Sequence, residues 1–329
     1  MFILLLNERL IQEHYLMHDA YQDLQKGIIA MQQGKIINPG RTVIEFEEHE
    51  ASVLYMPSAD TSEERTATKV VTIFPHNPQV HKPTTQGVLL LSDAANGDHI
   101  AMMNASYLTR LRTGALSAVG TNKLARKDAH VLGAIGTGGM AFEQVLGVLE
   151  VRDITQILLF NRTEEKAHQF KEKLIDFGVD IPMEVVTTSE EIVKDADIIN
   201  CSTRSNDPVF DGHLLKKGTH INGVGSYLPH MREVDVETLR KASLIVVDDL
   251  ASVKEEAGEM IYADKHTDWS FDQLYGELSD LEMNDTLIRT SDEEITFFKS
   301  VGTAYFDLII GNGIYNKAVA LNIGEQIEI

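Results

Sequence analysis

The segment HVLGAIGTGGMA, residues 130–141, decides the fold, because it places an apolar run of strand length directly before a glycine-rich turn. Similar apolar runs recur at residues 156–160, 183–186, 197–201, 219–224 and 244–247. Helix-like stretches at 139–150 and 163–177 separate the first runs. We therefore expect an α/β, Rossmann-like domain, whose six strands form a doubly wound parallel sheet covered by helices on both faces.

Within this segment lies a G-x-G-x-x-A loop made of Gly136, Thr137, Gly138, Gly139, Met140 and Ala141. The first glycine permits a tight turn, the second lets the backbone approach a pyrophosphate, and the small third residue lets helix pack on strand. The following helix would present its amino end to the diphosphate. An ordinary strand–helix turn also favours glycine, but a loop placed inside this alternation predicts a dinucleotide site.

The end of the second strand indicates which nicotinamide coenzyme binds. An enzyme that uses NAD usually carries Asp or Glu about 20 residues past the loop. This chain has Asn161, Arg162 and Thr163 there, and a guanidinium with a hydroxyl can pair with a 2′-phosphate. NADPH is therefore favoured, while NADH stays possible and Arg162 has the alternative of a solvated surface residue.

The flanking regions predict a second, α+β domain. A helical stretch at 7–33 precedes β-rich pieces at 52–56, 67–74 and 87–93, and residues 108–124 predict a connecting helix. Residues 291–294 have the form of a capping box, which predicts a long helix over 295–320 that returns to the first domain. We expect one domain over 1–116 with 306–329, and a coenzyme domain over 117–305.

Composition excludes several classes of partner. Fifty acidic residues against 29 basic ones give the 329-residue chain a formal charge of -21, which repels nucleic acid and anionic membrane surfaces. The lone Cys201 lies in an apolar run and predicts a buried thiol, with no disulfide or multi-thiolate metal site. The histidines do not fall at metal-ligand spacing, so no metal is expected. The apolar start Met1–Leu6 is too short for a signal or a membrane span, and we expect a cytoplasmic protein.

Several stretches, taken in order along the chain, resemble the ornithine cyclodeaminase/μ-crystallin family. They are Gly40-Arg41, residues 67–78, Leu111 to Ala115, the glycine loop, Asn161 to Thr163, Asn222 to Ser226, and Ser291 to Gly302. The resemblance implies a homodimer that associates through its amino-terminal domains. It also implies a substrate cleft between the two domains of the chain.

The resemblance also implies roles for individual residues. The substrate carboxylate would be held by Arg41, Lys69 and Arg112, although each cation taken singly is more often a solvated surface charge. The coenzyme would be contacted, beyond the loop and Asn161 to Thr163, by Arg112, Thr113, Ser202, Thr203, Val224 and Gly302. Lys69 is the candidate catalytic residue, because cationic neighbours would lower its pKa toward neutrality.

The family contains more than one chemistry. Its cyclodeaminases carry an Asp just after the Gly-Gly pair that follows the fifth strand, and Tyr227 stands near that position here. A phenol is a poor base at neutral pH, so ornithine cyclisation is disfavoured. The sequence resembles the ketimine reductase branch, which implies NADPH-dependent reduction of a small cyclic imine carboxylate, such as Δ1-pyrroline-2-carboxylate, to the L-amino acid. Reductive amination of an oxo acid, ornithine cyclodeamination and an NADPH-retaining binding protein without turnover remain the alternatives.

Overall fold

The computed structural model describes residues 2–284 and 286–329 and divides into two compact units. Unit 1 consists of the residues before Thr113 together with Thr303–Ile329, and unit 2 is Thr113–Gly302. The sequence analysis placed the two boundaries at residues 116/117 and 305/306. The helix α3 (Ala105–Leu124) carries the chain from the first unit into the second.

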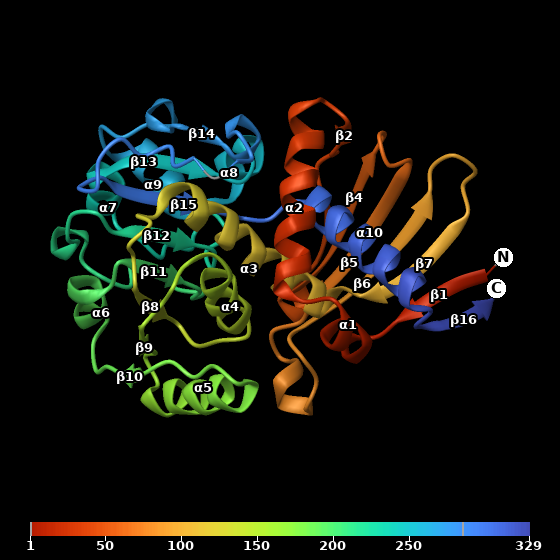
Figure 1. Ribbon diagram of the computed structural model, residues 1–329, viewed down its shortest axis with the longest axis horizontal. Coiled ribbons are helices and arrows are strands. Elements are labelled where there is room, and N and C mark those ends of the chain that lie inside the picture. The colour runs from red at the N-terminus through yellow and green to blue at the C-terminus, as the bar shows by residue number, and fades with distance from the viewer. Residues whose placement is uncertain (1, 285) are drawn as a thin grey trace. The chain divides into compact units, whose positions relative to one another are not determined.

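Unit 2 contains an eight-stranded sheet in the order β10-β9-β8-β11-β12-β15-β13-β14 (Figure 1). Its strands are β8 (Val131–Ile135), β9 (Gln156–Phe160), β10 (Met183–Val185), β11 (Ile198–Cys201), β12 (His220–Gly223), β13 (Ala242–Val247), β14 (Gly276–Glu277) and β15 (Ile295–Lys299). Every described pairing between these strands is parallel, which confirms the expected sheet. The direction of winding reverses between β8 and β11, so these neighbours mark the switch point where ligands of such sheets bind.

Helices cover both faces of this sheet. They are α4 (Ala141–Val151), α5 (Glu164–Phe177), α6 (Ser189–Asp195), α7 (Val236–Lys241), α8 (Leu250–Glu256) and α9 (Gly258–His266), with short 3-10 turns at Gly212–Leu214, Phe271–Gln273 and Leu278–Asp280. One apolar core joins Phe142 of α4 and Phe170 of α5, and a second joins Ile192 of α6 and Met260 of α9. Two cores on one parallel sheet confirm the doubly wound, Rossmann-like class.

The expected helix at 295–320 is wrong over its first nine residues, 295–303. Ile295–Lys299 forms β15, a fully buried strand between β12 and β13. The β-branched and aromatic side chains of Ile295, Thr296, Phe297 and Phe298 suit the interior of a sheet better than a helix. The helix itself, α10 (Ala304–Leu321), begins after Gly302, whose φ of +81° ends the extended backbone.

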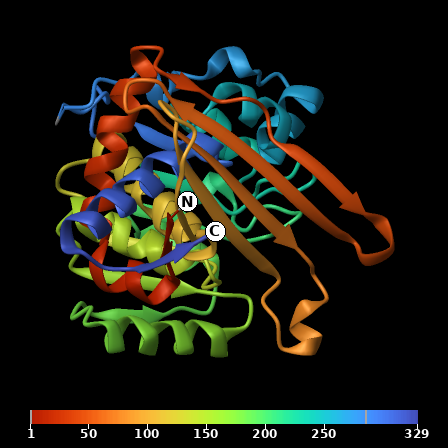
Figure 2. The same cartoon turned by 90° about the vertical axis from the view of Figure 1, so that its right-hand side faces the viewer.

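Unit 1 is a sheet in the order β16-β1-β7-β6-β5-β4-β2, with β3 also paired to β4 (Figure 1). Figure 2 shows the long orange strands of this sheet from the side. Its strands are β1 (Phe2–Leu6), β2 (Ile36–Ile37), β3 (Thr42–Phe46), β4 (Ala51–Asp60), β5 (Arg65–Ile73), β6 (Thr85–Asp93), β7 (His99–Asn104) and β16 (Glu325–Glu328), with 3-10 turns at Glu47–His49 and Asn77–Val80. The expected helix at 7–33 is two helices, α1 (Glu8–His14) and α2 (Met17–Gln32), because Asp19 accepts a hydrogen bond from the backbone N–H of Leu16 and starts a new helix there.

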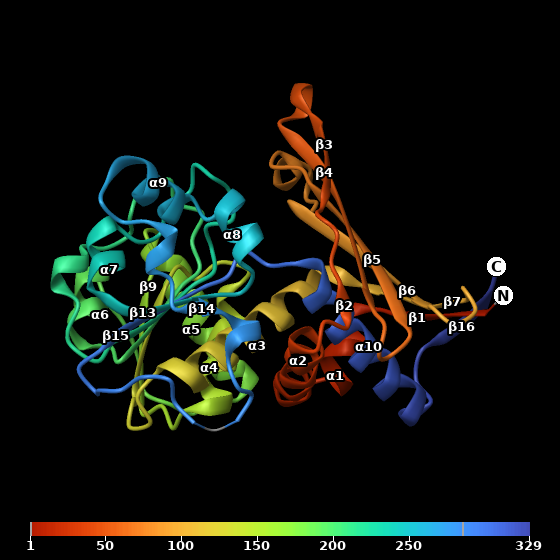
Figure 3. The same cartoon turned by 90° about the horizontal axis from the view of Figure 1, so that it is seen from above.

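The helices α1, α2 and α10 lie on one face of the unit 1 sheet, which Figure 3 shows edge-on. The α2 and α10 axes approach closely at Gly27, where a Cβ would come within 2.1 Å of Ile309. Along β5 the side chains alternate, and those of Ala67, Lys69 and Val71 are buried. This alternation brings the charged Lys69 under the helices.

Cys201 is buried among apolar side chains, which confirms its expected environment. On β7, Met103 is buried, whereas Met102 is 38% exposed on the other face of the strand. In the part of the chain that is described, no helix is long and apolar enough to cross a membrane.

Candidate functional site

The glycine loop follows β8 at the switch point of the unit 2 sheet. Gly136 has a φ of +90°, and a Cβ on it would come within 2.7 Å of the Thr203 side chain. Its N–H donates to the Phe160 carbonyl at 2.9 Å, and its own carbonyl accepts from the Ser202 hydroxyl at 3.0 Å. The loop is therefore tied to the ends of both neighbouring strands, β9 and β11, and glycine is required by both its backbone angle and its surroundings.

The rest of the loop fits a diphosphate. Gly138 and Gly139 are exposed, and a Cβ at either would meet no atom within 4 Å. The Thr137 hydroxyl is buried without a hydrogen-bond partner among the described residues. Met140 stands at the N-cap of α4 and makes no side-chain capping hydrogen bond, and the Ala141 N–H donates to the Gly138 carbonyl at 3.2 Å. A helix end without a side-chain cap suits a bound anion. Open backbone, an orphaned hydroxyl and an uncapped helix end together suit a dinucleotide.

The end of β9 lies beside this loop. The Asn161 side chain accepts from the Thr137 N–H at 3.3 Å and donates to the Thr163 carbonyl at 2.9 Å, so it joins the two segments. Arg162 is exposed, and within the described ranges its guanidinium makes no ion pair. Thr163 stands at the N-cap of α5, but its hydroxyl makes no capping hydrogen bond. The Arg162 guanidinium and the Thr163 hydroxyl therefore have no partner within the described ranges of the chain and can contact a ligand.

Three more strand ends complete this edge of the sheet. Ser202 and Thr203 follow β11, and the Val224 N–H donates to the Cys201 carbonyl at 3.0 Å after β12. Gly302 follows β15 and donates its N–H to the buried carboxylate of Asp248 at 2.8 Å. The expected coenzyme residues of unit 2 therefore gather at the carboxyl ends of its strands. The exception is the buried Thr113, which lies on α3 where that helix enters the unit.

The expected substrate residues belong to unit 1, where Lys69 and Arg112 pair with one acid and Arg41 is close enough to act on the charge of Lys69. The ammonium of Lys69 lies 2.6 Å from Oδ2 of Asp307 on α10, and Nε of Arg112 on α3 lies 3.2 Å from Oδ1. Lys69 also donates to the Thr109 hydroxyl at 3.3 Å. Lys69, Arg112 and Asp307 are at most 5% exposed, and Arg41 before β3 is half-buried. Three cations and one carboxylate leave this cluster with an excess of positive charge.

Burial is the first cause of an unusual pKa at Lys69. Burial lowers the pKa of the ammonium, Asp307 raises it, and Arg112 and Arg41 lower it, so that together they bring it from 10.5 to about 8. The sequence analysis attributed a lowered pKa to neighbouring cations alone. The structure adds a larger contribution from desolvation and a carboxylate that keeps much of the charge on Lys69.

Asp307 was missed by the sequence analysis. It is the single acidic residue in the apolar sequence of α10, AYFDLIIGNGIYNKAVAL, and its side chain is 1% exposed. A carboxylate on an otherwise apolar helix is a signal for a buried partner of opposite charge. The sequence pattern predicts the helical region but does not show which face of it is buried, so it does not identify the partner of Asp307.

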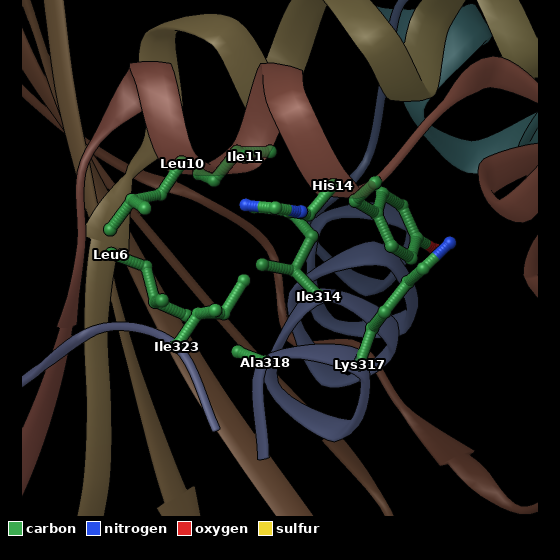
Figure 4. Close-up of a pocket in the computed structure, with 9 residues that line it drawn as sticks. Leu6, Leu10, Ile11, His14, Ile314, Lys317, Ala318 and Ile323 are labelled. Carbon is green, nitrogen blue, oxygen red and sulfur yellow. The ribbon is translucent and has the colours of Figure 1, made fainter. Parts of the chain in front are cut away.

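Two further features are Tyr227 in unit 2 and a small hollow in unit 1. Tyr227 follows β12, is half-buried and packs against the apolar core of unit 2. In unit 1 a small apolar hollow is lined by Leu6, Leu10, Ile11, Ile314 and Ile323, with His14 and Lys317 at its side (Figure 4). None of the expected site residues lines it. No group of three or more His, Cys, Asp or Glu residues suited to a metal occurs within residues 2–284 and 286–329.

The chain matches one family model over nearly its whole length. Residues 3–322 match the model described as the ornithine cyclodeaminase/mu-crystallin family. The Δ(1)-pyrroline-2-carboxylate reductase of Bacillus cereus is 39% identical over 295 residues, which cover 89% of this chain and 90% of that protein.

Solved structures agree in fold across the whole chain. The Thermococcus litoralis Δ(1)-pyrroline-2-carboxylate reductase, solved with NADH and L-proline, superposes with a TM-score of 0.93 at 34% identity, covering 99% of this chain and 100% of that one. An archaeal alanine dehydrogenase dimer with bound NAD superposes with a TM-score of 0.91 at 31% identity and full coverage of both chains. The expected fold class is therefore confirmed by two solved relatives as well as by topology.

Proposed function

We propose that this chain, which belongs to the ornithine cyclodeaminase/mu-crystallin family, is an NAD(P)H-dependent oxidoreductase that reduces a small cyclic imine carboxylate to an L-amino acid. Δ1-Pyrroline-2-carboxylate, with L-proline as product, is the substrate we favour. One observation carries the proposal: Lys69 and Arg112 pair with a single buried carboxylate in unit 1, and Arg41 adds its positive charge to theirs, which leaves a positively charged cluster in an acidic protein. Such a cluster attracts a small anion.

The reduction adds a hydride to the imine carbon and a proton to the imine nitrogen. The coenzyme, when bound, supplies the hydride. Arg112 and Arg41 hold the substrate carboxylate and orient the imine, because a guanidinium pairs with a carboxylate through two parallel hydrogen bonds. Lys69 donates the proton, since a pKa of about 8 lets it hold a proton at neutral pH and still release it.

NADPH is the coenzyme we favour over NADH. Arg162 and Thr163 at the end of β9 offer an exposed cation and an unused hydroxyl, and the two side chains match a 2′-phosphate. The solved relatives were crystallised with NADH and NAD, so use of NADH by this chain is the expected second activity. The ratio of kcat/KM for the two coenzymes measures the preference.

We also propose that the chain forms a homodimer through unit 1. The sheet face opposite the helices carries Tyr55, Val70, Val88, Leu90 and Met102 on adjacent strands. Tyr55, Val88 and Met102 are 40%, 48% and 38% exposed. Apolar side chains in register over several strands are typical of a face covered by another subunit. A cytoplasmic location, expected from the sequence, stays a prediction.

The test measures NADPH oxidation side by side on Δ1-pyrroline-2-carboxylate, Δ1-piperideine-2-carboxylate and pyruvate with ammonia, with an ornithine cyclisation control. We expect the cyclic imines to give the highest kcat/KM. Faster turnover of pyruvate with ammonia would favour the alanine dehydrogenase-like activity. Proline formation from ornithine would identify a cyclodeaminase, and coenzyme binding without any oxidation would identify a binding protein.

A further inference from the structure

Unit 2 contains a cluster of buried charges that the proposed reaction does not use. Glu233, Glu259 and Lys299 are at most 1% exposed. Two carboxylates and one ammonium without solvent are costly for a fold, because each ion loses its hydration and the attraction between them repays only part of that loss. Because this cost is not offset by packing alone, we looked for a role of these three residues in the function of unit 2.

Glu233 is surrounded by hydrogen-bond donors from two separate segments. Its Oε1 accepts from the N–H and the hydroxyl of Thr203, the latter at 2.9 Å, after β11. Its Oε2 accepts from the N–H of Gly225 at 2.7 Å and of Ser226 at 3.1 Å, after β12. Burial raises the pKa of the Glu233 carboxyl, whereas Lys299 and the backbone donors lower it. Four donors on two oxygens are the pattern that an ionised carboxylate accepts.

Lys299 and Glu259 hold the second of these segments from its other side. The Lys299 ammonium donates to the carbonyl and the hydroxyl of Ser226, each at 2.6 Å, and lies 2.8 Å from Glu259. The Ser226 hydroxyl in turn donates to the Glu259 carboxylate at 2.8 Å. All three N–H groups of the ammonium therefore have an acceptor, and Ser226 cannot move without breaking several of these contacts.

The two segments are in direct backbone contact. A Cβ on Gly225 would lie 2.1 Å from the Thr203 carbonyl oxygen, so only glycine fits there. The residue before Thr203, Ser202, donates to the carbonyl of Gly136 in the glycine loop. Glu233 thus links the ends of β11 and β12 to the loop after β8, at the edge of the sheet where dinucleotides bind.

We propose that Glu233, supported by the Lys299–Glu259 pair, is a positioning residue for the coenzyme. It fixes the Ser202–Thr203 and Val224–Ser226 segments in the shape that receives the nicotinamide dinucleotide, and it acts through their backbone. The inference rests on the proposed function only in the use of a nicotinamide coenzyme. It does not depend on which substrate is reduced.

The test substitutes Glu233→Gln and compares it with Asp197→Asn as a matched control. An amide has one acceptor oxygen and turns its NH2 toward two N–H donors, so it cannot hold both segments. Asp197 is also a buried carboxylate that accepts from two backbone N–H groups, those of His130 and Val131, but it lies at the opposite, amino-terminal edge of the same sheet. Both variants lose comparable backbone contacts, and only one loses them at the coenzyme edge.

Coenzyme binding is measured directly, as the Kd of NADPH and NADH from the fluorescence change on titration, together with Tm. We expect Glu233→Gln to raise the coenzyme Kd about tenfold, and Asp197→Asn to lower Tm with an unchanged Kd. At saturating coenzyme, the KM for the imine should stay the same in Glu233→Gln. An unchanged Kd in Glu233→Gln, or an equal rise in Asp197→Asn, would overturn the proposal.

A milder variant keeps the test decisive if Glu233→Gln does not fold. Ser226→Ala removes the hydroxyl that bridges Lys299 and Glu259 but leaves the Glu233 contacts in place, and we expect its coenzyme Kd to rise about threefold. A Kd equal to that of the unmodified protein would then count against the positioning role. If the unmodified protein binds coenzyme but reduces no imine, the proposed reaction fails while the role of Glu233 can still be measured.

Discussion

Asp307→Asn is the substitution that most directly tests the chemistry of unit 1. The asparagine keeps the size of the side chain and one acceptor oxygen, but it removes the charge that lies 2.6 Å from Lys69 and 3.2 Å from Arg112. Since Asp307 is the group that raises the pKa of Lys69 against burial and two cations, its loss leaves only effects that lower this pKa. We therefore expect the ammonium to lose its proton at a lower pH.

The size of the effect follows from the distances. Two unit charges about 4 Å apart interact by roughly 4 kcal/mol at an effective dielectric constant near 20, and one pKa unit corresponds to about 1.4 kcal/mol. Relaxation of the side chains and entry of water reduce this, so we expect the pKa of Lys69 to fall by about one to three units from its value near 8. That range would bring it to neutrality or below.

The assay is the pH profile of kcat/KM for the imine at saturating NADPH. If protonated Lys69 is required, its titration leaves kcat/KM unchanged below about pH 8. Above that pH, kcat/KM falls tenfold per pH unit, because the ammonium loses its proton as the pH rises through the pKa. In Asp307→Asn this fall should begin at a lower pH. The substrate's own titration is common to both enzymes, so the shift between the two profiles is the readout.

A control separates this shift from damage to the fold. Asp60→Asn changes a buried carboxylate of the same unit that accepts from Ser62 and Glu63 in a turn. It should lower Tm modestly and leave the pH profile in place. Identical alkaline limbs in Asp307→Asn and the unmodified enzyme would refute the claim that Asp307 keeps Lys69 charged.

Three further substitutions test separate parts of the account. Lys69→Met should lower kcat for the imine about a hundredfold or more, since it removes the proposed proton donor, and unchanged turnover would exclude that role. Arg162→Glu should raise the KM for NADPH about tenfold or more while the KM for NADH changes little, and an equal change in both would argue against a 2′-phosphate contact. Gly147→Ala should lower the free energy of unfolding by about 3 kcal/mol in chemical denaturation. The new Cβ would lie 2.1 Å from the Gly114 carbonyl oxygen, and the backbone there cannot move aside. A loss of less than about 1 kcal/mol would contradict this packing.

The alternating part of the fold was predictable because its strands are short, apolar and separated by helices. Residues 156–160 form β9 over the expected range, and the glycine turn at Gly136 lies where the motif places it. The strand β15 could not be predicted from the sequence, for a physical reason. Its residues are buried on both faces, so they show no alternation, and an apolar run next to a capping-box pattern reads equally well as a helix. Only its pairing with β12 and β13 distinguishes the two.

The strands β1 and β3 of unit 1 could not be predicted for a different reason. Phe2–Leu6 is a run of apolar residues with no alternation, and it becomes a strand by pairing with β7 and β16, which are far away in the sequence. Thr42–Phe46 pairs with β4 alone and is exposed along its whole length. Strand formation at such positions depends on partners more than on local propensity.

The candidate site contains two groups of residues: those proposed to contact a ligand, and those that hold the first group in place. Arg41, Lys69 and Arg112 could be proposed because the family resemblance points to residues that touch substrate. Asp307 pairs with Lys69 and Arg112, and Glu233 accepts from backbone beside the glycine loop. In a chain with 50 acidic side chains nothing local distinguishes Glu233 from a solvated acid, whereas Asp307 differs from such acids by the apolar sequence around it. The partners of both acids become known only from the fold, because a buried carboxylate must be matched by donors. For each predicted ligand-binding cation or loop in such a protein, the buried acid that holds it in place therefore has to be identified as well.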